Sequence, residues 1–159
     1  MKKYIITVFF ILLPILCSAE PIRVVLLNPG GNHWFWEMVV DYMQAAAEDL
    51  DMELEVVTSD WNHLLTIQQS KKVVNRKNPP DYIITGNEKG NAGEIIKICD
   101  KAGVNVFLFS NGFANSEDIT AFGDPREKYK HWIGEIIPNN FSAGYQMGKV
   151  LIDEALSDN

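Results

Sequence analysis

Amide and aromatic side chains stand together in the segment Asn32-His33-Trp34-Phe35-Trp36. Flat aromatic faces stack against the C–H faces of a sugar ring, and an asparagine amide offers both a donor and an acceptor to hydroxyl groups. This combination suits a neutral polyol. The competing interpretation assigns the rings to the core, since helical spacing places Phe35 on the buried side of the helix that follows. Trp34 falls off that side, so we predict that it contacts a ligand, with Asn32, Phe35 and Trp36 as further candidates.

A second group of polar residues follows the later strands of the predicted fold. Taken singly, each of them fits an ordinary turn, and Asn111-Gly112 is a strong turn signal. In a parallel sheet, however, the carboxyl ends of the strands share one edge, and ligands bind outside that edge. The joint placement therefore predicts a common ligand rim. Its predicted members are Asn87, Ser110, Asn111 and Asn139, with Asn140 beside them.

Residues that would mark catalysis, a metal or a nucleotide form no pattern in the sequence. His33, His63 and His131 lack the paired spacing of metal ligands. Neither a Gly-x-Ser-x-Gly elbow nor a Walker-type phosphate loop occurs. The turn Pro29-Gly30-Gly31 follows a predicted strand but lacks the Gly-x-Gly-x-x-Gly spacing of a dinucleotide site. We therefore expect no catalytic residue, no metal ion and no cofactor.

The amino terminus has the layout of a secretory signal peptide. Two lysines precede the uncharged apolar run Tyr4–Cys17, and small residues end it, so we expect cleavage after Ala19 and a periplasmic protein. The run of roughly 14 residues is shorter than the about 20 that a membrane-spanning helix requires, which weakens the alternative of a membrane anchor. Lipidation of Cys17 is a further alternative, weakened by Leu16 at a position where a small residue is expected.

The chain is acidic, with a net charge of −7 over 159 residues. An acidic chain without a basic cluster argues against nucleic acid and against anionic membrane surfaces as partners. After cleavage Cys99 would be the only cysteine, so no intrachain disulfide could form, and its apolar neighbours predict a core position. The remaining roughly 140 residues are enough for one domain with a core of its own.

Short apolar runs alternate with segments of helical period along the chain. The run Ile22–Leu27 is almost unbroken, which is typical of a strand buried on both faces of a parallel sheet. The alternation predicts an α/β fold, a Rossmann-like three-layer lobe with a parallel sheet and right-handed crossovers. The predicted strands are 22–27, 53–58, 81–85, 104–109 and 132–137, and the predicted helices are 35–50, 62–76, 92–102 and 140–155.

Two local expectations accompany this fold. The segment Ser110–Lys130 shows no clear period and is predicted as a long polar connection. The first helix has apolar residues at helical spacing, which predicts a buried stripe. That predicted stripe consists of Phe35, Val39, Met43, Ala46 and Leu50.

Three stretches of the sequence resemble the periplasmic sugar-binding proteins of ABC transporters, of the ribose-binding kind and related to the autoinducer-2 receptor. The segment Asn32-His33-Trp34-Phe35 is similar to the family's Asn-Pro-aromatic-aromatic loop, with His33 in place of the proline. The other two stretches resemble the family's third and fourth strands and its crossover into a second lobe. They are residues 80–85 with 103–106, and residues 136–140 with Gly144 and Gly148.

The resemblance implies a two-lobed type I binding protein of which this chain holds a part. Residues 1–19 would be the signal peptide, 20–138 the first lobe, and 139–159 the start of a truncated second lobe. The implied ligand is a sugar or a similar small polar molecule. The implied partner is a membrane permease or a sensor kinase that receives it.

The sequence also departs from this family at the predicted rim. The family often has an acidic residue and an arginine where Ser110 and Asn111 stand, and an aspartate where Asn139 stands. These departures leave binding by amides and aromatic rings in place. They weigh against a ligand specificity like that of ribose-binding or glucose-binding proteins. Two other functions stay open: a one-lobe interaction protein that contacts a membrane partner without a ligand, and an exported Rossmann-like oxidoreductase. The export signal weighs against the oxidoreductase, since soluble nicotinamide cofactors are not expected outside the cytoplasm.

Overall fold

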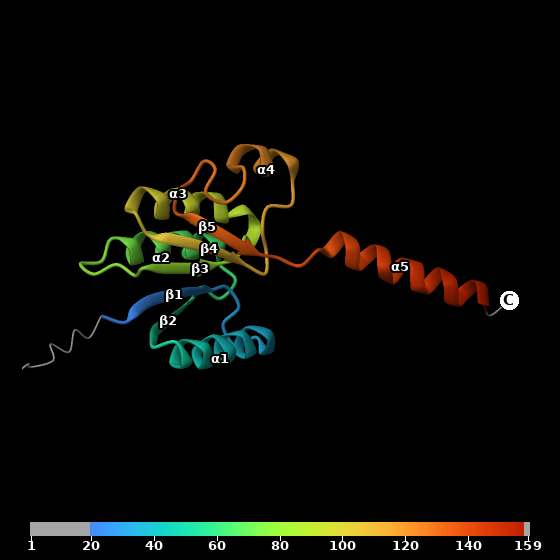
Figure 1. The fold of residues 1–159 in the computed structure, drawn as a ribbon, viewed down its shortest axis with the longest axis horizontal. Helices are drawn as coiled ribbons and strands as arrows, with labels where there is room; N and C mark the ends of the chain where they lie inside the picture. The colour runs from blue at the N-terminus through green and yellow to red at the C-terminus, as the bar shows by residue number, and fades with distance from the viewer. Residues whose placement is uncertain (1–19, 158–159) are drawn as a thin grey trace, which may run out of the picture.

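Five parallel strands form one sheet in the order β2-β1-β3-β4-β5 (Figure 1). The computed structural model describes residues 20–157, so the predicted signal peptide, residues 1–19, lies outside the described residues. Each strand begins and ends within about two residues of its predicted bounds. The strands are β1 (Ile22–Asn28), β2 (Met52–Thr58), β3 (Tyr82–Thr85), β4 (Asn105–Phe109) and β5 (Trp132–Ile136).

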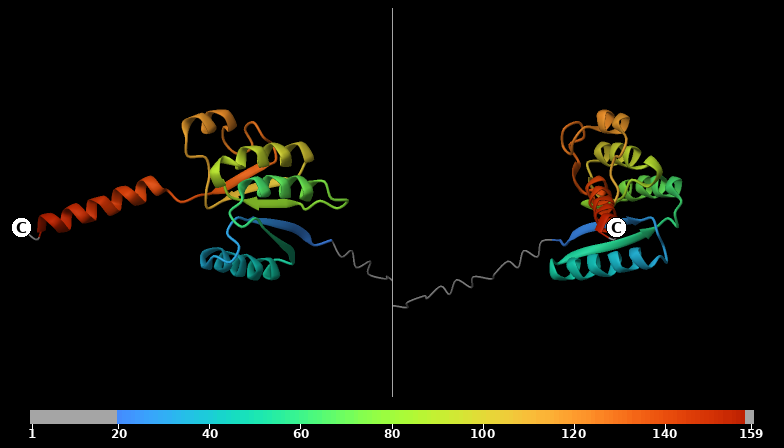
Figure 2. Two further views of the ribbon diagram at one scale, coloured as in Figure 1. Left: turned by 180° about the vertical axis from the view of Figure 1, so that it is seen from behind. Right: turned by 90° about the vertical axis from the view of Figure 1, so that its right-hand side faces the viewer.

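Helices cover both faces of the sheet, which gives the predicted three layers. Helix α1 lies under β1 and β2 on one face, whereas α2 and α3 lie on the other (Figure 2). The predicted α/β fold with a parallel sheet is therefore confirmed. The helices are α1 (Trp34–Asp49), α2 (His63–Val74), α3 (Ala92–Ala102), α4 (Ser116–Phe122) and α5 (Asn140–Ser157), with a short 3-10 turn η1 (Glu88–Gly90).

The core lies mainly between the sheet and helix α3. Val25 and Leu27 of β1 face this core, while Leu26 between them is buried on the α1 side. Strand β1 is thus buried on both faces, as its unbroken apolar run predicts. Cys99 belongs to the same core, and burial raises the pKa of its thiol to about 12. Cys99 therefore packs as a small apolar residue, as expected.

The buried stripe of α1 differs from the predicted one. The helix buries Trp36, Val39 and Ala47, whereas Leu50 is 63% exposed. The cause is Trp36, whose ring packs so closely over Gly30 that a Cβ there would overlap the indole. This contact fixes the rotation of the helix, and the stripe moves from Phe35 toward Trp36. The prediction from the helical period assigned the wrong rotation, because apolar residues fill both sides of the first turn.

The predicted polar connection 110–130 contains the short helix α4, so that prediction is wrong. Asn115 caps the helix, since its Oδ1 accepts a hydrogen bond of 2.7 Å from the backbone N–H of Asp118. Phe122 at its end is buried and stacks on Phe113 with ring centroids 4.7 Å apart. Seven residues are too few to show a helical period, and one buried aromatic stack holds the segment in place.

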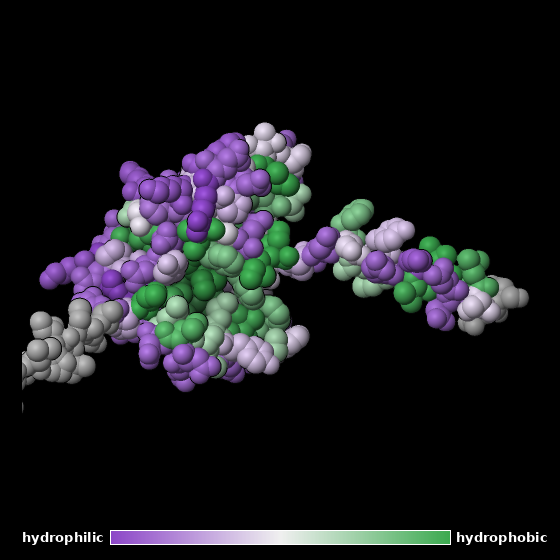
Figure 3. Space-filling model, in the orientation of Figure 1, coloured by the Kyte–Doolittle hydropathy of each residue, from purple (hydrophilic) through white to green (hydrophobic). Residues whose placement is uncertain are grey.

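Helix α5 projects away from the lobe and none of its described residues is buried (Figures 1 and 3). Its apolar side chains are open to solvent, and Phe141 is 86% exposed. No helix within residues 20–157 combines the length and apolar character that a membrane crossing requires. Strand β5 ends at Ile136 and α5 begins at Asn140, and the predicted lobe boundary at residues 138 and 139 stays a prediction.

Replacing Gly93 with alanine is expected to lower the free energy of unfolding by about 1–3 kcal/mol. A Cβ on Gly93 would overlap the Phe122 ring, which is already stacked between Phe113 and Tyr129. Chemical denaturation measures the loss. Gly144→Ala is the matched control, because a Cβ there meets no atom within 4 Å. A loss for Gly93→Ala no larger than that of the control would contradict the packing of α4 on α3.

Candidate functional site

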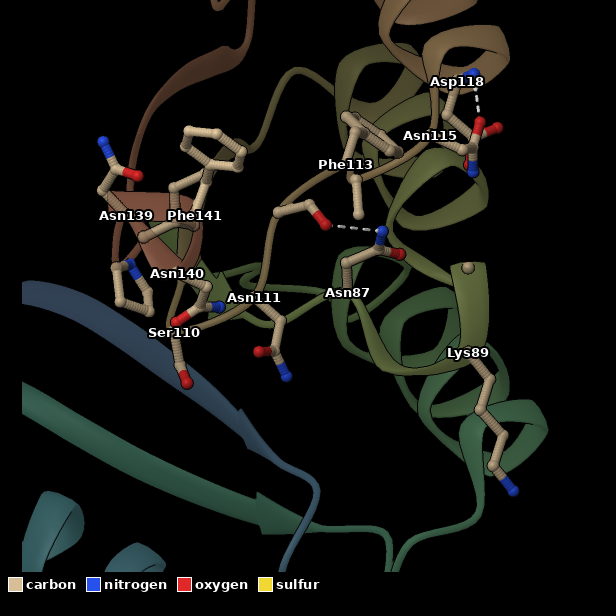
Figure 4. Close-up of a pocket in the computed structure, with 15 residues that line it drawn as sticks. Asn87, Lys89, Ser110, Asn111, Phe113, Asn115, Asp118, Asn139, Asn140 and Phe141 are labelled. Atoms are coloured by element: carbon tan, nitrogen blue, oxygen red, sulfur yellow. Dashed lines mark hydrogen bonds between the residues drawn. The ribbon is translucent and has the colours of Figure 1, made fainter. Parts of the chain in front are cut away.

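The carboxyl ends of the strands meet at a topological switch point between β1 and β3. The chain leaves β1 toward α1 on one face, and it leaves β3 toward α3 on the other. Such a divergence opens a crevice beyond the strand ends. A pocket of about 810 Å³ lies at this edge, over β3, β4 and β5 (Figure 4). Its wall consists of residues 87, 89, 90, 110–115, 118 and 137–141.

Asn87 joins two turns of the pocket wall to each other and to helix α3. Its Nδ2 donates to the carbonyl of Gly112 at 3.0 Å, and its Oδ1 accepts from the backbone N–H of Ala92, also at 3.0 Å. The backbone N–H of Asn87 donates to the carbonyl of Asn111 at 2.9 Å. The residue therefore ties the turn after β3 to the turn after β4 and provides an acceptor for the first backbone N–H of α3. One N–H and one lone pair of the amide remain for another partner.

Ser110 lies at a strained point directly after β4. Its φ of 71° is in the left-handed region, and the backbone N–H of Asn111 donates to the carbonyl of Phe109 at 2.8 Å, which closes a tight turn around it. The N–H of Ser110 donates to the carbonyl of Ile136. Strained backbone of this kind is concentrated at binding sites. The turn sets both Ser110 and Asn111 on the wall of the pocket.

The remaining wall comes from the segments on either side of β5. Asn139 caps α5, since its Oδ1 accepts from the backbone N–H of Ser142 at 2.9 Å. Phe141 adds an exposed ring, and Asn115 and Asp118 close the wall opposite (Figure 4). Sequence reasoning missed Asn115 and Asp118 because it assigned their segment no structure. The Asn115-x-x-Asp118 spacing, a helix cap with an acidic first turn, was the signal available.

The predicted site residues fall into two groups. Asn87, Ser110, Asn111 and Asn139 line the pocket together. Asn32 in the turn after β1 and Trp34 at the start of α1 are exposed and lie outside the pocket wall, and Phe35 is half-buried. Trp36 is 4% exposed and packs edge to face on Phe35 and Phe109. The structure thus gives Trp36 a packing role beneath the rim. Its buried ring has no open face for a ligand, so the prediction that Trp36 contacts the ligand is wrong.

Few charges reach the pocket. Asp118 accepts a hydrogen bond of 2.7 Å from Asn115 Nδ2, and Lys89 extends away from the cluster of amides (Figure 4). Behind the turn at Gly112, burial and the nearby Asp124 raise the pKa of Glu135. Within the described part of the chain, no three His, Cys, Asp or Glu side chains converge as a metal site.

Replacing Asn87 with alanine is expected to lower the free energy of unfolding by about 1–3 kcal/mol, since two hydrogen bonds to the backbone lose their partner. Thermal or denaturant unfolding gives the value. Asn140→Ala is the matched control, because Asn140 is an exposed amide on the same pocket wall. Equal stability of the two variants would show that Asn87 does not hold the turns together.

No protein-family model matches the chain, and no curated protein matches it. Several solved structures, in contrast, match the chain. A periplasmic sugar-binding protein from Pseudomonas fluorescens is 28% identical with a TM-score of 0.63, and the match covers 80% of this chain and 35% of that one.

Two further structures share the fold at lower identity. An ABC transporter protein of the LacI transcriptional-regulator family from Brachyspira murdochii is 18% identical, with a TM-score of 0.68 over 89% of this chain and 41% of that one. A 5-methylthioribose transporter solute-binding protein from Thermotoga lettingae, solved with 5-methylthioribose, is 19% identical, with a TM-score of 0.61 over 84% and 38%. The chain thus spans about two fifths of the length of these proteins. Residues 20–157 have the lobe fold of the type I periplasmic binding proteins, and the chain is similar to the sugar-binding members among them.

Proposed function

We propose that this chain forms one side of the ligand cleft of an exported solute-binding protein, and that the ligand is a neutral sugar or a similar polyol. The observation that carries the proposal is the composition of the rim. Six amide or hydroxyl side chains line one pocket at the strand ends together with two aromatic rings, Phe113 and Phe141. The six are Asn87, Ser110, Asn111, Asn115, Asn139 and Asn140. Amides and hydroxyls exchange hydrogen bonds with sugar hydroxyls, and aromatic rings cover the C–H faces.

The lack of free charge in the pocket favours a neutral ligand over a phosphorylated or carboxylated one. A phosphate or carboxylate site is normally built from arginine or from several backbone N–H groups. The pocket holds no arginine, and its lysine, Lys89, points away from the amides. The Asp118 carboxylate is bonded to Asn115 within the wall, and the Glu88 carboxylate beside the wall accepts a hydrogen bond of 2.7 Å from Asn111 Nδ2. A sugar with free hydroxyls satisfies the remaining groups without leaving a charge unpaired.

The whole protein would act outside the cytoplasm and deliver its ligand to a membrane permease or a sensor kinase. The signal-like residues 1–19 support export, and the similarity to a periplasmic sugar-binding protein and to a transporter's solute-binding protein supports delivery. In this proposal a second lobe supplies the other wall of the cleft. The segment 137–140 then connects the two walls, and closure around the ligand is a hinge motion about it.

Trp34→Ala is expected to weaken binding of a neutral sugar at least tenfold without lowering the unfolding temperature. Trp34 is 68% exposed on the rim, so its truncation removes a stacking face and little core packing. Isothermal titration with D-ribose, D-glucose and D-galactose gives the affinities, with ribose 5-phosphate as the charged comparison. The neutral sugars should bind more tightly.

Tyr42→Ala is the control for this titration, because Tyr42 is equally exposed, at 70%, but lies midway along α1. It should leave affinity unchanged. A preference for ribose 5-phosphate, or equal effects of the two variants, would contradict the proposed ligand class. Binding of nicotinamide nucleotides instead of sugars would support the oxidoreductase.

A further inference from the structure

A second cluster of aromatic side chains lies at the strand ends, outside the pocket wall. His33 is its centre. Its ring centroid is 5.8 Å from that of Trp34 and 5.9 Å from that of Trp61, which meets it edge to face at 87°. Both indoles are open to solvent, Trp34 at 68% and Trp61 at 50%. We name these three residues the aromatic ledge. Trp61 follows β2, and the rim proposed above does not include it.

The backbone holds Trp61 in an unusual conformation. Asp60 and Trp61 have φ values of 48° and 62°, a region that residues other than glycine rarely adopt. The N–H of Trp61 donates to the carbonyl of Pro29 at 2.6 Å, which ties the turn after β2 to the turn after β1. A Cβ on Gly31 would overlap the Asp60 carboxylate, so the two turns are also in close contact there. These contacts hold the Trp61 turn against the turn that carries Trp34.

The ledge also carries a polar group between its two indoles. His33 Nδ1 accepts a hydrogen bond from the backbone N–H of Phe35 at 3.4 Å as it caps α1. The neutral ring then has its proton on Nε2, which leaves one outward donor. Two exposed indoles and one donor match the C–H face and the hydroxyls of a sugar ring.

The distance between the ledge and the pocket determines how long a shared ligand must be. The strand order places β2, which precedes Trp61, one position beyond β1, whereas the pocket lies over β3, β4 and β5. Adjacent strands are about 4.8 Å apart, so Trp61 and the pocket are separated by roughly 10–14 Å along the edge of the sheet. A single sugar ring is too small to touch both.

The geometry points to a ligand with two rings, a disaccharide or a glycoside of that size. One ring occupies the amide-lined pocket and reaches Trp34 at the near end of the aromatic ledge, and the second lies on His33 and Trp61 at its far end. This inference rests on the proposed function, because it extends the same cleft toward β1 and β2. Trp61 is then a residue that determines ligand length.

The test compares the affinities of D-glucose and D-galactose with those of maltose, cellobiose and lactose for the full protein. At least one disaccharide should bind tenfold or more tightly than its component monosaccharides. Trp61→Gly removes the ring and suits the left-handed backbone, so the turn should keep its fold. It should abolish the disaccharide advantage and leave monosaccharide affinity within twofold. Trp61→Phe, which keeps an aromatic face, should retain most of the advantage.

The outcomes separate the two proposals. If monosaccharides bind and every disaccharide binds equally or more weakly, the two-ring ligand is wrong while the sugar-binding function stands. The two-ring ligand is also wrong if Trp61→Gly weakens monosaccharides and disaccharides alike, or leaves the disaccharide advantage intact. If no sugar in the panel binds, both the proposed function and the two-ring ligand are overturned. Unchanged unfolding temperatures for both Trp61 variants confirm that the comparison concerns binding alone.

Discussion

The burial of β1 on both faces is the constraint on which the rest of the lobe depends. Val25 and Leu27 must be covered by α3 and its neighbours, and Leu26 must be covered by α1. Strand β1 can satisfy both only in the interior of the sheet, where it pairs with β2 on one side and β3 on the other. The chain must then leave β1 and β3 toward opposite faces. The crevice at the strand ends follows from that divergence.

Asparagine side chains make hydrogen bonds that hold several of the turns around this crevice. Asn28 is buried, and its Oδ1 accepts from the N–H of Gly30, which fixes the turn after β1. Asn87 does the same for the turns after β3 and β4, and Asn139 caps α5. The side chains that make the rim polar are therefore also those that shape it. A ligand meets groups whose positions are already set, which reduces the entropy lost on binding.

The sequence predicted the strands and the common edge well, because β-branched apolar runs and the turns between them are local signals. It located Asn87, Ser110, Asn111 and Asn139 on one pocket for the same reason. It did not predict features that depend on contacts between distant segments. The rotation of α1 follows from the packing of Trp36 over Gly30 and against Phe109 of β4, and helix α4 is held by the stack of Phe122 on Phe113. The exposure of Trp61 likewise depends on a backbone conformation that its residue type disfavours.

Binding of a neutral sugar at the strand-end edge is the central claim. Nitrogen–proton correlation spectra of the protein, recorded while the tightest-binding neutral sugar is added, test this claim most directly. We predict shifts confined to the segments that follow the carboxyl ends of the strands, including the side-chain amides of Asn87 and Asn111. Shifts confined to the opposite edge, around Asp81 and Asn105 at the amino ends of β3 and β4, would contradict the claim.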